Sequence, residues 1–269
     1  MKRIGALAAA IVTTAAIGPA AVAAPAPFYH WPATPRTMAY HVGGTVQVTA
    51  VSSGKTVTVD ETMSGLIVQH IFPRPNDNAA VTMMYKNFAV GLGKAAPKAI
   101  PQLNGAGVAF HVGQFGRVTD TRVIGFKLSP ALQKELSSLT GSLTGSFGSV
   151  FPLVPHTVFK PGVSWLNTSS IGLLGSPITA TAKTTYDGPV GPALRFVTVA
   201  TVKVPPKTLV SGTMSDTTTV NLWSKTHLLQ SETTTEGGAL KLSLTIAGKT
   251  VTATEKLNMV IALKEVPVP

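Results

Sequence analysis

Long stretches of this chain alternate apolar and polar residues, and the clearest is LKLSLTIAGKTVTATEKLNMVIAL, from Leu240 to Leu263. Successive side chains of a β-strand point to opposite faces, so this alternation predicts a hairpin that is apolar on one side only. Such a face has to be covered by the rest of the protein or by a ligand. The apolar positions of this hairpin that we expect to contact a ligand are Leu242, Leu244, Met259 and Ile261.

Shorter runs with the same alternation predict antiparallel strands in the N-terminal half. Residues 44–51 and 55–63 form one predicted hairpin around the turn SSG, and residues 66–72 form a separate third strand that ends at PRPND. Residues 80–92 form another strand. GVAFHVGQF and DTRVIGFKL then form a further pair, joined near Gly116.

The C-terminal half repeats this organisation. A strand that begins near Val163 is followed by strands at 178–186 and 194–204, on either side of DGPVGPA. Residues 208–223 and 228–236 come next, and EGG is the predicted turn into the final hairpin. About eleven strands result, which is typical of an antiparallel meander in two sections.

One segment between the two sections, residues 129–149, has the pattern of a helix. Ser129 is a suitable N-cap and Pro130 fits the first helical position. Glycines in its second half each cost about 1 kcal/mol relative to alanine, so this half should be soft. Apolar residues recur at steps of four and three and share one face; they are Leu132, Leu136, Leu139, Leu143 and Phe147.

One helix of this size cannot cover the apolar face of about eleven strands. The sheet must therefore curl on itself, pack against a second sheet or enclose a ligand. Thr, Val and Ile dominate these segments and favour strands, and a sheet of such strands can curl. We expect a mainly β fold, a curved antiparallel half-barrel of about eleven strands with one helical insertion as lid. A two-sheet β-sandwich is the alternative.

The N-terminus has the composition of a secretory signal peptide. Two basic residues precede an apolar segment at 4–17 that is too short to span a membrane well, and Ala21 and Ala23 supply an A-x-A cleavage pattern. A periplasmic or secreted location follows. The expected divisions are a signal peptide at 1–23, a proline-rich tether at 24–36, and a single domain at 37–266 that contains the insertion at 129–149.

The chain has a formal net charge of +11, although only 12% of its residues are charged. A small positive excess of this kind favours anionic lipid surfaces or acidic glycans over neutral partners, or else it serves only solubility. There is no cluster of Lys and Arg with interleaved aromatic residues, so we expect no nucleic-acid partner. The sequence contains no cysteine, which excludes disulfides and thiol chemistry.

No catalytic or metal-binding motif is present, so we expect neither an enzyme nor a bound metal or cofactor. The six histidines lack metal-ligand spacing, and SSGKT has Thr49 where a phosphate loop requires its first glycine. Asp60 and Glu61 point to opposite faces of one strand and cannot act on one bond together. Glu61 and Glu255 share the apolar face of their strands, either near a strand end or bulge, or as buried acids that contact a ligand head group.

Residues 151–165, FPLVPHTVFKPGVSW, precede and open the second strand section. With the export signal and the helical insertion, this segment resembles the half-barrel lipid carriers of the bacterial envelope, the LolA/LolB-type lipoprotein carriers and exported proteins of the same shape. In that family the concave face takes acyl chains under covering helices, which implies that Leu132, Leu136, Leu139 and Leu143 are lid residues. This chain is longer than the best-known carriers and has fewer predicted helices. The matching residues are Phe151, Pro152, Lys160, Pro161, Gly162, Ser164 and Trp165.

These observations predict an exported binding protein that holds a hydrophobic, lipid-like ligand on the concave face of a curved sheet. Phe196, on the apolar face of its strand, completes the expected ligand contacts. We expect a monomer, with an anionic membrane surface as a further partner. The alternative function is that of a non-catalytic β-sandwich with a structural role at the cell surface.

Overall fold

The computed structural model describes the chain from residue 28 onward, with gaps. The predicted signal peptide and the predicted helix at 129–149 lie outside the described residues. The side chains of residues 169–179, 210, 240, 242–251, 253 and 255 are likewise not described. The described ranges are 28–52, 55–76, 78–125, 151–155, 160–173, 176–204, 210–246 and 249–269.

The described residues form long strands and one short 3₁₀ helix, η1 (Pro101–Leu103). Over these same ranges, no helix has the length and hydropathy needed to cross a membrane. The strands are β1 (Arg36–Ser52), β2 (Lys55–Arg74), β3 (Asn78–Leu92), β4 (Lys98–Ala99), β5 (Gly107–Val112), β6 (Val118–Ile124), β7 (Ser164–Leu173), β8 (Ser176–Val190), β9 (Ala193–Val204), β10 (Val210–Trp223), β11 (Leu229–Ile246) and β12 (Lys249–Val266).

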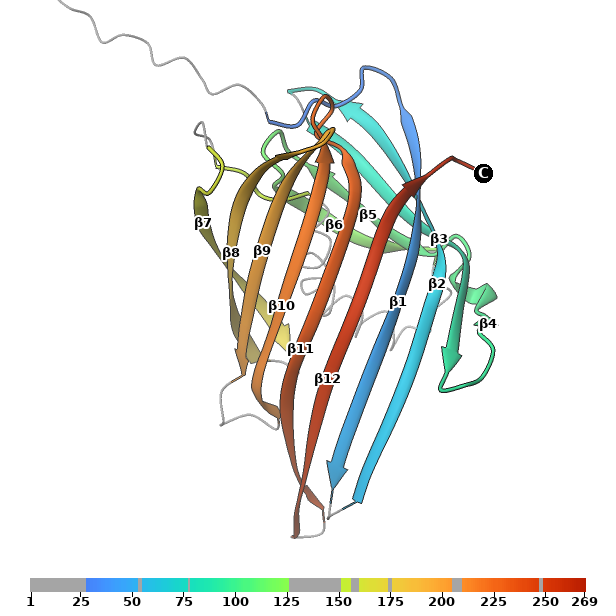
Figure 1. Ribbon diagram of the computed structural model, residues 1–269, viewed down its shortest axis with the longest axis vertical. Helices are drawn as coiled ribbons and strands as arrows, with labels where there is room; N and C mark the ends of the chain where they lie inside the picture. Colours follow the sequence, from blue (N-terminus) through green and yellow to red (C-terminus); the bar gives the residue numbers. More distant parts are fainter. Residues whose placement is uncertain are drawn as a thin grey trace, which may run out of the picture.

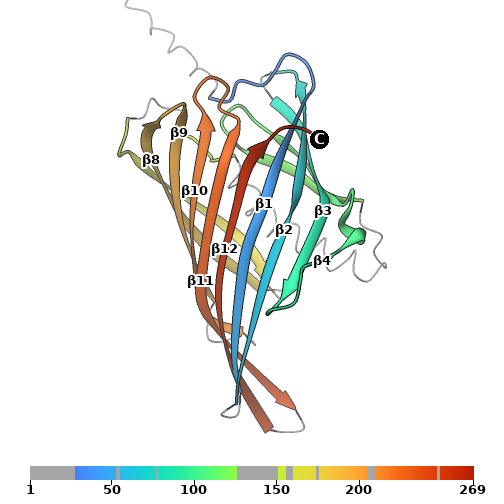
Figure 2. The same cartoon turned by 45° about the vertical axis from the view of Figure 1, so that its right-hand side comes forward.

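All twelve strands belong to one antiparallel sheet. Their order is β6-β5-β3-β2-β1-β12-β11-β10-β9-β8-β7, with β4 added beside β3. The sheet curves, so that β5 and β6 lie behind the strands β10–β12 (Figures 1 and 2). The predicted mainly β, curved antiparallel half-barrel is confirmed, and the strands described do not divide into the two sheets of a sandwich.

One predicted strand boundary and one predicted turn are wrong, because a strand continues through glycine at both places. β2 is continuous where the pattern predicts two strands, and β11 runs through EGG. A Cβ on Gly65 would lie 2.6 Å from Phe88 Cδ2, and one on Gly238 would lie 2.6 Å from the backbone oxygen of Thr213. Glycine inside a strand marks a close approach of this kind as well as a turn.

The register assigns strand residues to two faces. Tyr40, Phe196 and Leu222 are fully buried and belong to one hydrophobic core with Phe110 of β5, across the curve of the sheet. We call the side of the sheet that bears them the inner face. The opposite side is the outer face. Residues that are opposite each other on paired strands share a face, so inner-face residues form rows across the sheet.

Apolar side chains fill the inner face at one end of the sheet, which we call the core end. Residues 28–31 and 151–154, outside the sheet, pack there. Tyr29 donates a hydrogen bond from its hydroxyl to the backbone oxygen of Pro152 at 2.9 Å. Its backbone N–H donates to the carbonyl of Gln114 at 2.9 Å. The described part of the predicted tether is therefore docked on the domain.

Aromatic rings connect distant strands at the core end. The ring of Phe151 lies 5.7 Å from that of Tyr29 and 6.1 Å from that of Phe110 on β5, measured between centroids. The ring of Phe28 lies 5.9 Å from that of Phe196 on β9. Offset and edge-to-face pairs at these distances are favourable. The rings therefore help to hold the two arms of the curved sheet together.

Replacing Tyr29 with phenylalanine should lower the free energy of unfolding by about 1 kcal/mol, because the buried carbonyl of Pro152 loses its donor. Urea unfolding followed by circular dichroism measures this loss. Tyr85→Phe is the matched control, since the Tyr85 hydroxyl makes no hydrogen bond to the described residues. An equal loss in both variants would show that the hydrogen bond of Tyr29 is not the cause.

Candidate functional site

The inner face extends beyond the core toward the turns that join β1 to β2 and β11 to β12, and we call this end the hairpin end. Val57 and Val59 on β2 are 59% and 40% exposed there, and Leu92 on β3 is 57% exposed. In the register, Val57 lies opposite Ala50, and Val59 lies opposite Val48. The inner face therefore presents apolar side chains to solvent at the hairpin end.

This apolar surface crosses seven strands in one register row, which we call the apolar row. It lies on the hairpin side of the buried core. On β1, the inner face continues from Val46 to Ser52, six residues or about 20 Å of strand. The apolar row consists of Val59, Val48, Leu257, Gly238, Met214, Val202 and Ala180.

The structure brings some of the predicted ligand contacts to this face. Met259 and Ile261 are half-buried and lie opposite Val46 and Gly44 of β1. Phe196 also belongs to the inner face, but it is 0% exposed and lies inside the packed core. The strand positions of Leu242 and Leu244 are described, whereas their side chains are not. The residues Leu132, Leu136, Leu139, Leu143 and Phe147 lie outside the described residues.

A row of threonines separates the core from the rest of the inner face. Thr184 and Thr198 share a hydrogen bond of 2.9 Å between their hydroxyls, and Thr218 and Thr234 share one of 3.0 Å. Thr184 and Thr218 are 3% and 4% exposed. Buried hydroxyls are tolerated when they satisfy one another in this way. We call these four residues the threonine row.

Two carboxyl groups face each other between the threonine row and the apolar row. Asp216 on β10 and Glu236 on β11 are directly opposite in the register, and both are half-buried. The same register row continues through Met259 and Val46 to Glu61 on β2. Like charges at directly opposite positions of a sheet repel each other. The inner face is therefore not uniformly apolar, as the alternation alone would indicate.

Burial raises the pKa values of both members of this pair. For Asp216, burial raises the pKa, and a hydrogen bond from the backbone of Ala200 partly opposes the rise. For Glu236, burial raises the pKa first and the neighbouring Asp216 carboxylate raises it further. The described strand neighbours in this row, Ala200 and Met259, supply no cation to offset these effects.

Two further acids occupy the inner face nearer the core. Glu232 is 6% exposed, and one of its oxygens accepts a hydrogen bond of 3.1 Å from Thr234. Glu265 accepts a hydrogen bond of 2.5 Å from Trp223 Nε1. Burial and the neighbouring Glu265 carboxylate raise the pKa of Tyr40. Among the described residues, no three His, Cys, Asp or Glu side chains are grouped to hold a metal ion.

Sequence reasoning identified Glu61 but missed Asp216, Glu232 and Glu236. Glu61 lies in the interior of β2, half-buried and away from the bulge after Ser64, so it is an acid on the apolar side and not a strand-end residue. Asp216 falls on the same alternate positions of its strand as the apolar residues do, and this signal is visible in the sequence. That it faces Glu236 follows from the strand register, which the sequence does not state.

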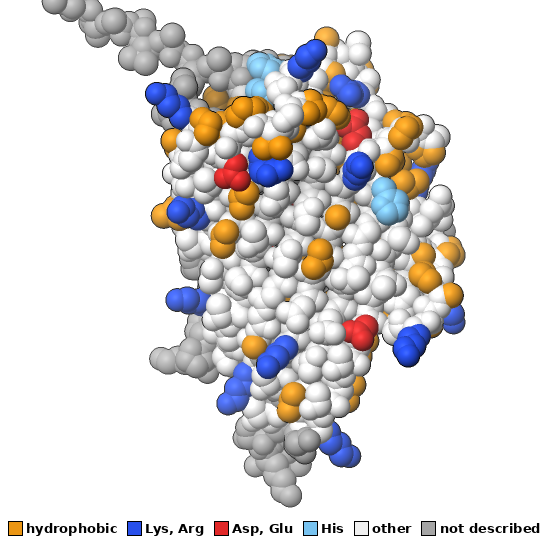
Figure 3. All heavy atoms as spheres, viewed as in Figure 1, with side chains coloured by type: hydrophobic (Ala, Val, Ile, Leu, Met, Phe, Trp, Pro, Cys, Tyr) orange, Lys and Arg blue, Asp and Glu red, His pale blue; other side chains and the backbone are white. Residues whose placement is uncertain are grey.

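The described Lys and Arg side chains of strands β8–β12 lie on the outer face. Figure 3 shows this side, which is largely uncharged and polar over its middle, with separated Lys and Arg side chains and isolated apolar residues; apolar side chains gather near its upper end. Single exposed apolar residues such as Val199 and Val260, 46% and 43% exposed, are ordinary on a surface. The basic residues at outer-face positions of β8–β12 are Lys183, Arg195, Lys203, Lys241, Lys256 and Lys264.

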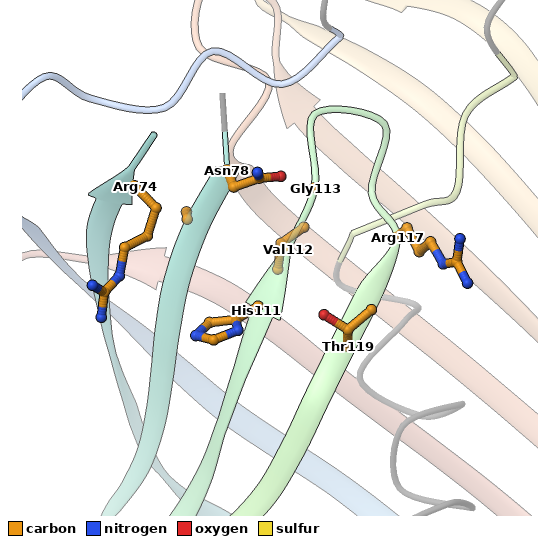
Figure 4. Close-up of a pocket in the computed structure, with 8 residues that line it drawn as sticks. Arg74, Asn78, His111, Val112, Gly113, Arg117 and Thr119 are labelled. Carbon is orange, nitrogen blue, oxygen red and sulfur yellow. The ribbon is translucent and has the colours of Figure 1, made fainter. Parts of the chain in front are cut away.

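A separate hollow of about 530 Å³ lies where β2, β3, β5 and β6 turn. Figure 4 shows that the side chains of Arg74 and Arg117 extend in different directions and do not converge on one point. His111 is paired with Asp120 at 2.9 Å. This hollow therefore lacks a focused set of ligand-binding groups. Its lining consists of Arg74, Asn78, Ala79, His111, Val112, Gly113, Arg117 and Thr119.

No protein-family profile and no curated protein matches this sequence. Among solved structures, the chain is similar to one described as lipid-protein interactions in lipovitellin, with 12% identity and a TM-score of 0.43 over 86% of this chain. The chain spans 26% of that lipovitellin chain. It is also similar to a DUF1329 family protein from Desulfovibrio piger ATCC 29098, with 8% identity and a TM-score of 0.15 over 81% of this chain and 83% of the other. Neither similarity assigns a family, and the resemblance to LolA/LolB-type carriers stays a prediction.

Proposed function

We propose that this protein is an exported, non-catalytic binding protein that holds a hydrophobic, lipid-like ligand on its inner face. The observation that carries the proposal is the exposure of Val57, Val59 and Leu92 on the side of the sheet that curves inward. Concave, mostly apolar surfaces with a few polar groups are the usual sites for such ligands. The sequence features of a signal peptide support export.

The dimensions of the inner face suit an acyl chain. Val46 to Ser52 of β1 covers about 20 Å of strand, whereas the acyl chains of one bilayer leaflet reach about 15 Å, half of a 30 Å hydrocarbon core. Burying apolar surface contributes about 25 cal/mol for each Å² removed from water. A ligand that covers the exposed valines would therefore bind because it removes their apolar surface from water, and no chemical step is needed.

The test compares the two faces of the sheet. Val57→Thr with Val59→Thr replaces apolar groups on the inner face at nearly constant volume, and should weaken binding of a fluorescent acyl probe to the delipidated protein about three- to tenfold. Val199→Thr with Val260→Thr makes the same change at similarly exposed outer-face positions. This control pair should leave the dissociation constant unchanged.

Two results would contradict the proposal. The first is that the delipidated protein binds no acyl probe and that the protein from its native source carries no lipid by mass spectrometry. The second is an equal loss of affinity in the inner-face and outer-face pairs, which would place the probe outside the inner face.

A further inference from the structure

Charged residues in the strands β8–β12 separate between the two faces of the sheet. The six Lys and Arg side chains named above take outer-face positions, and the described acids in regular register take inner-face ones. Asp187, at the bulge of β8, and Lys249, whose side chain is not described, are the exceptions to this sorting. The inner-face acids are Asp216, Glu232, Glu236 and Glu265.

Three acids of the inner face, Asp216, Glu236 and Glu61, occupy one level of it, whereas Glu232 and Glu265 lie nearer the core. Asp216 and Glu236 lie directly between the threonine row, on their core side, and the apolar row, on their hairpin side. Glu61 completes this level three strands away from Glu236, roughly 14 Å at the usual strand spacing. An amphiphile whose tail lies along the apolar surface toward the hairpin end would therefore place its head group against carboxylates and hydroxyls.

We propose that the inner face selects an amphiphile with an organic cationic head group, such as an ammonium, and discriminates against a free carboxylate or phosphate. This inference rests on the proposed function and deepens it by naming the head-group class. Carboxylates that are already close together and partly buried gain a partner when a cation binds between them. An anionic head group would add a third like charge at the same level.

The net charge of the whole molecule predicts the opposite preference, for an anionic head group, so the test can distinguish the two causes. The chain carries a net charge of +11, and the outer face of β8–β12 carries six bases. A probe attracted by this overall field would therefore bind better as an anion. A preference for the cation can arise from the inner face and not from the net charge.

The experiment uses three fluorescent probes with one common alkyl chain and different head groups: a primary ammonium, a hydroxyl and a carboxylate. Binding to the delipidated mature chain is measured at pH 7.5 and 0.15 M salt, where exposed charges further apart than about 8 Å are largely screened. We expect the ammonium probe to bind about tenfold more tightly than the carboxylate probe, with the hydroxyl probe between them.

The variant Asp216→Asn with Glu236→Gln should reduce the ammonium-to-carboxylate ratio to about twofold or less. Asp60→Asn is the matched control for the charge change, since Asp60 faces outward on β2 and accepts a hydrogen bond of 2.8 Å from Gln47. This control should keep the tenfold ratio. Binding of the hydroxyl probe reports whether each variant retains its folded inner face.

The outcomes separate the inference from the proposed function. If no probe binds, the proposed function fails and the inference fails with it. If all three probes bind alike, or the carboxylate probe binds most tightly, the head-group inference is overturned while the binding function stands. A tenfold preference that persists in the Asp216 and Glu236 variant would also overturn it, because the selectivity would then arise elsewhere.

Discussion

Replacing Phe196 with alanine should lower the free energy of unfolding by about 3–5 kcal/mol. The ring is 0% exposed and lies 5.1 Å from Tyr186, 5.9 Å from Phe28 and 6.3 Å from Trp165 between centroids. Truncation would remove its buried apolar surface and leave a cavity whose walls belong to several different elements. Urea unfolding, followed by tryptophan fluorescence, measures the loss.

Two controls separate packing from ligand contact. Val199→Ala on the outer face of the same strand should change the free energy of unfolding by less than about 0.5 kcal/mol, because Val199 is 46% exposed. Phe196→Leu keeps most of the apolar volume and should retain acyl-probe binding. A leucine variant of normal stability that binds no probe would show that Phe196 contacts the ligand directly, as the sequence pattern suggested.

The alternation of apolar and polar residues predicted the architecture because it is visible within each strand separately. It shows that one face of that strand is buried and the other is exposed. The alternation at 44–51 and 55–63 is local, and it fixes which residues share a face before any pairing is known. The errors occurred where one residue type has two physical roles. Gly65 was placed between two predicted strands and Gly238 in a predicted turn, yet both sit inside strands where a side chain would meet a neighbouring residue.

The acids of the inner face could be predicted one at a time but not as a group. Asp216 and Glu236 are 20 positions apart in the sequence, and each interrupts an otherwise apolar or threonine-rich face. Their opposition depends on the register of β10 against β11, which the length of the intervening turn and the bulge at Asn221 and Leu222 determine. A shift of one residue in this register would have placed them on opposite faces.

The aromatic contacts at the core end show the same limit. The sequence reveals a cluster of aromatic residues at 28–31 in a proline-rich segment, and a second aromatic-containing segment begins at Phe151. Neither segment has a periodic pattern, so alternation says nothing about where it packs. The contacts of Tyr29 with Pro152 and Phe151 connect positions more than 120 residues apart, which no local rule could supply.

The carboxyl pair should make the protein less stable as pH rises. Burial raises the pKa values of Asp216 and Glu236 in the folded state, so the folded protein holds their protons to higher pH than the unfolded chain does. Below about pH 3, which is under the ordinary pKa values of Asp and Glu, both carboxyls are protonated in either state and this penalty is absent. It grows as pH rises through the raised values and is complete above them.

Asp216→Asn with Glu236→Gln should therefore raise the free energy of unfolding at pH 7.5 by about 1–2 kcal/mol, a value reduced by the solvent exposure of both groups. The same substitution should have little effect at pH 3. Glu232 and Glu61 share the inner face with this pair and remain in both proteins, as does His227, whose pKa burial lowers. The difference between variant and parent therefore reports the pair alone.

A repulsive pair of carboxylates has a defined signature in a double-mutant cycle, which the two single substitutions measure. Either Asp216→Asn or Glu236→Gln alone should supply somewhat more than half of the gain at pH 7.5, because it removes one burial cost and also relieves the repulsion. The second substitution should therefore add less than the first. Urea unfolding of the four proteins at pH 3 and pH 7.5 measures the cycle. Strictly additive gains would mean that each carboxyl is penalised by burial alone, and a loss of stability in both single variants would mean that the carboxylates have stabilising partners in the folded protein.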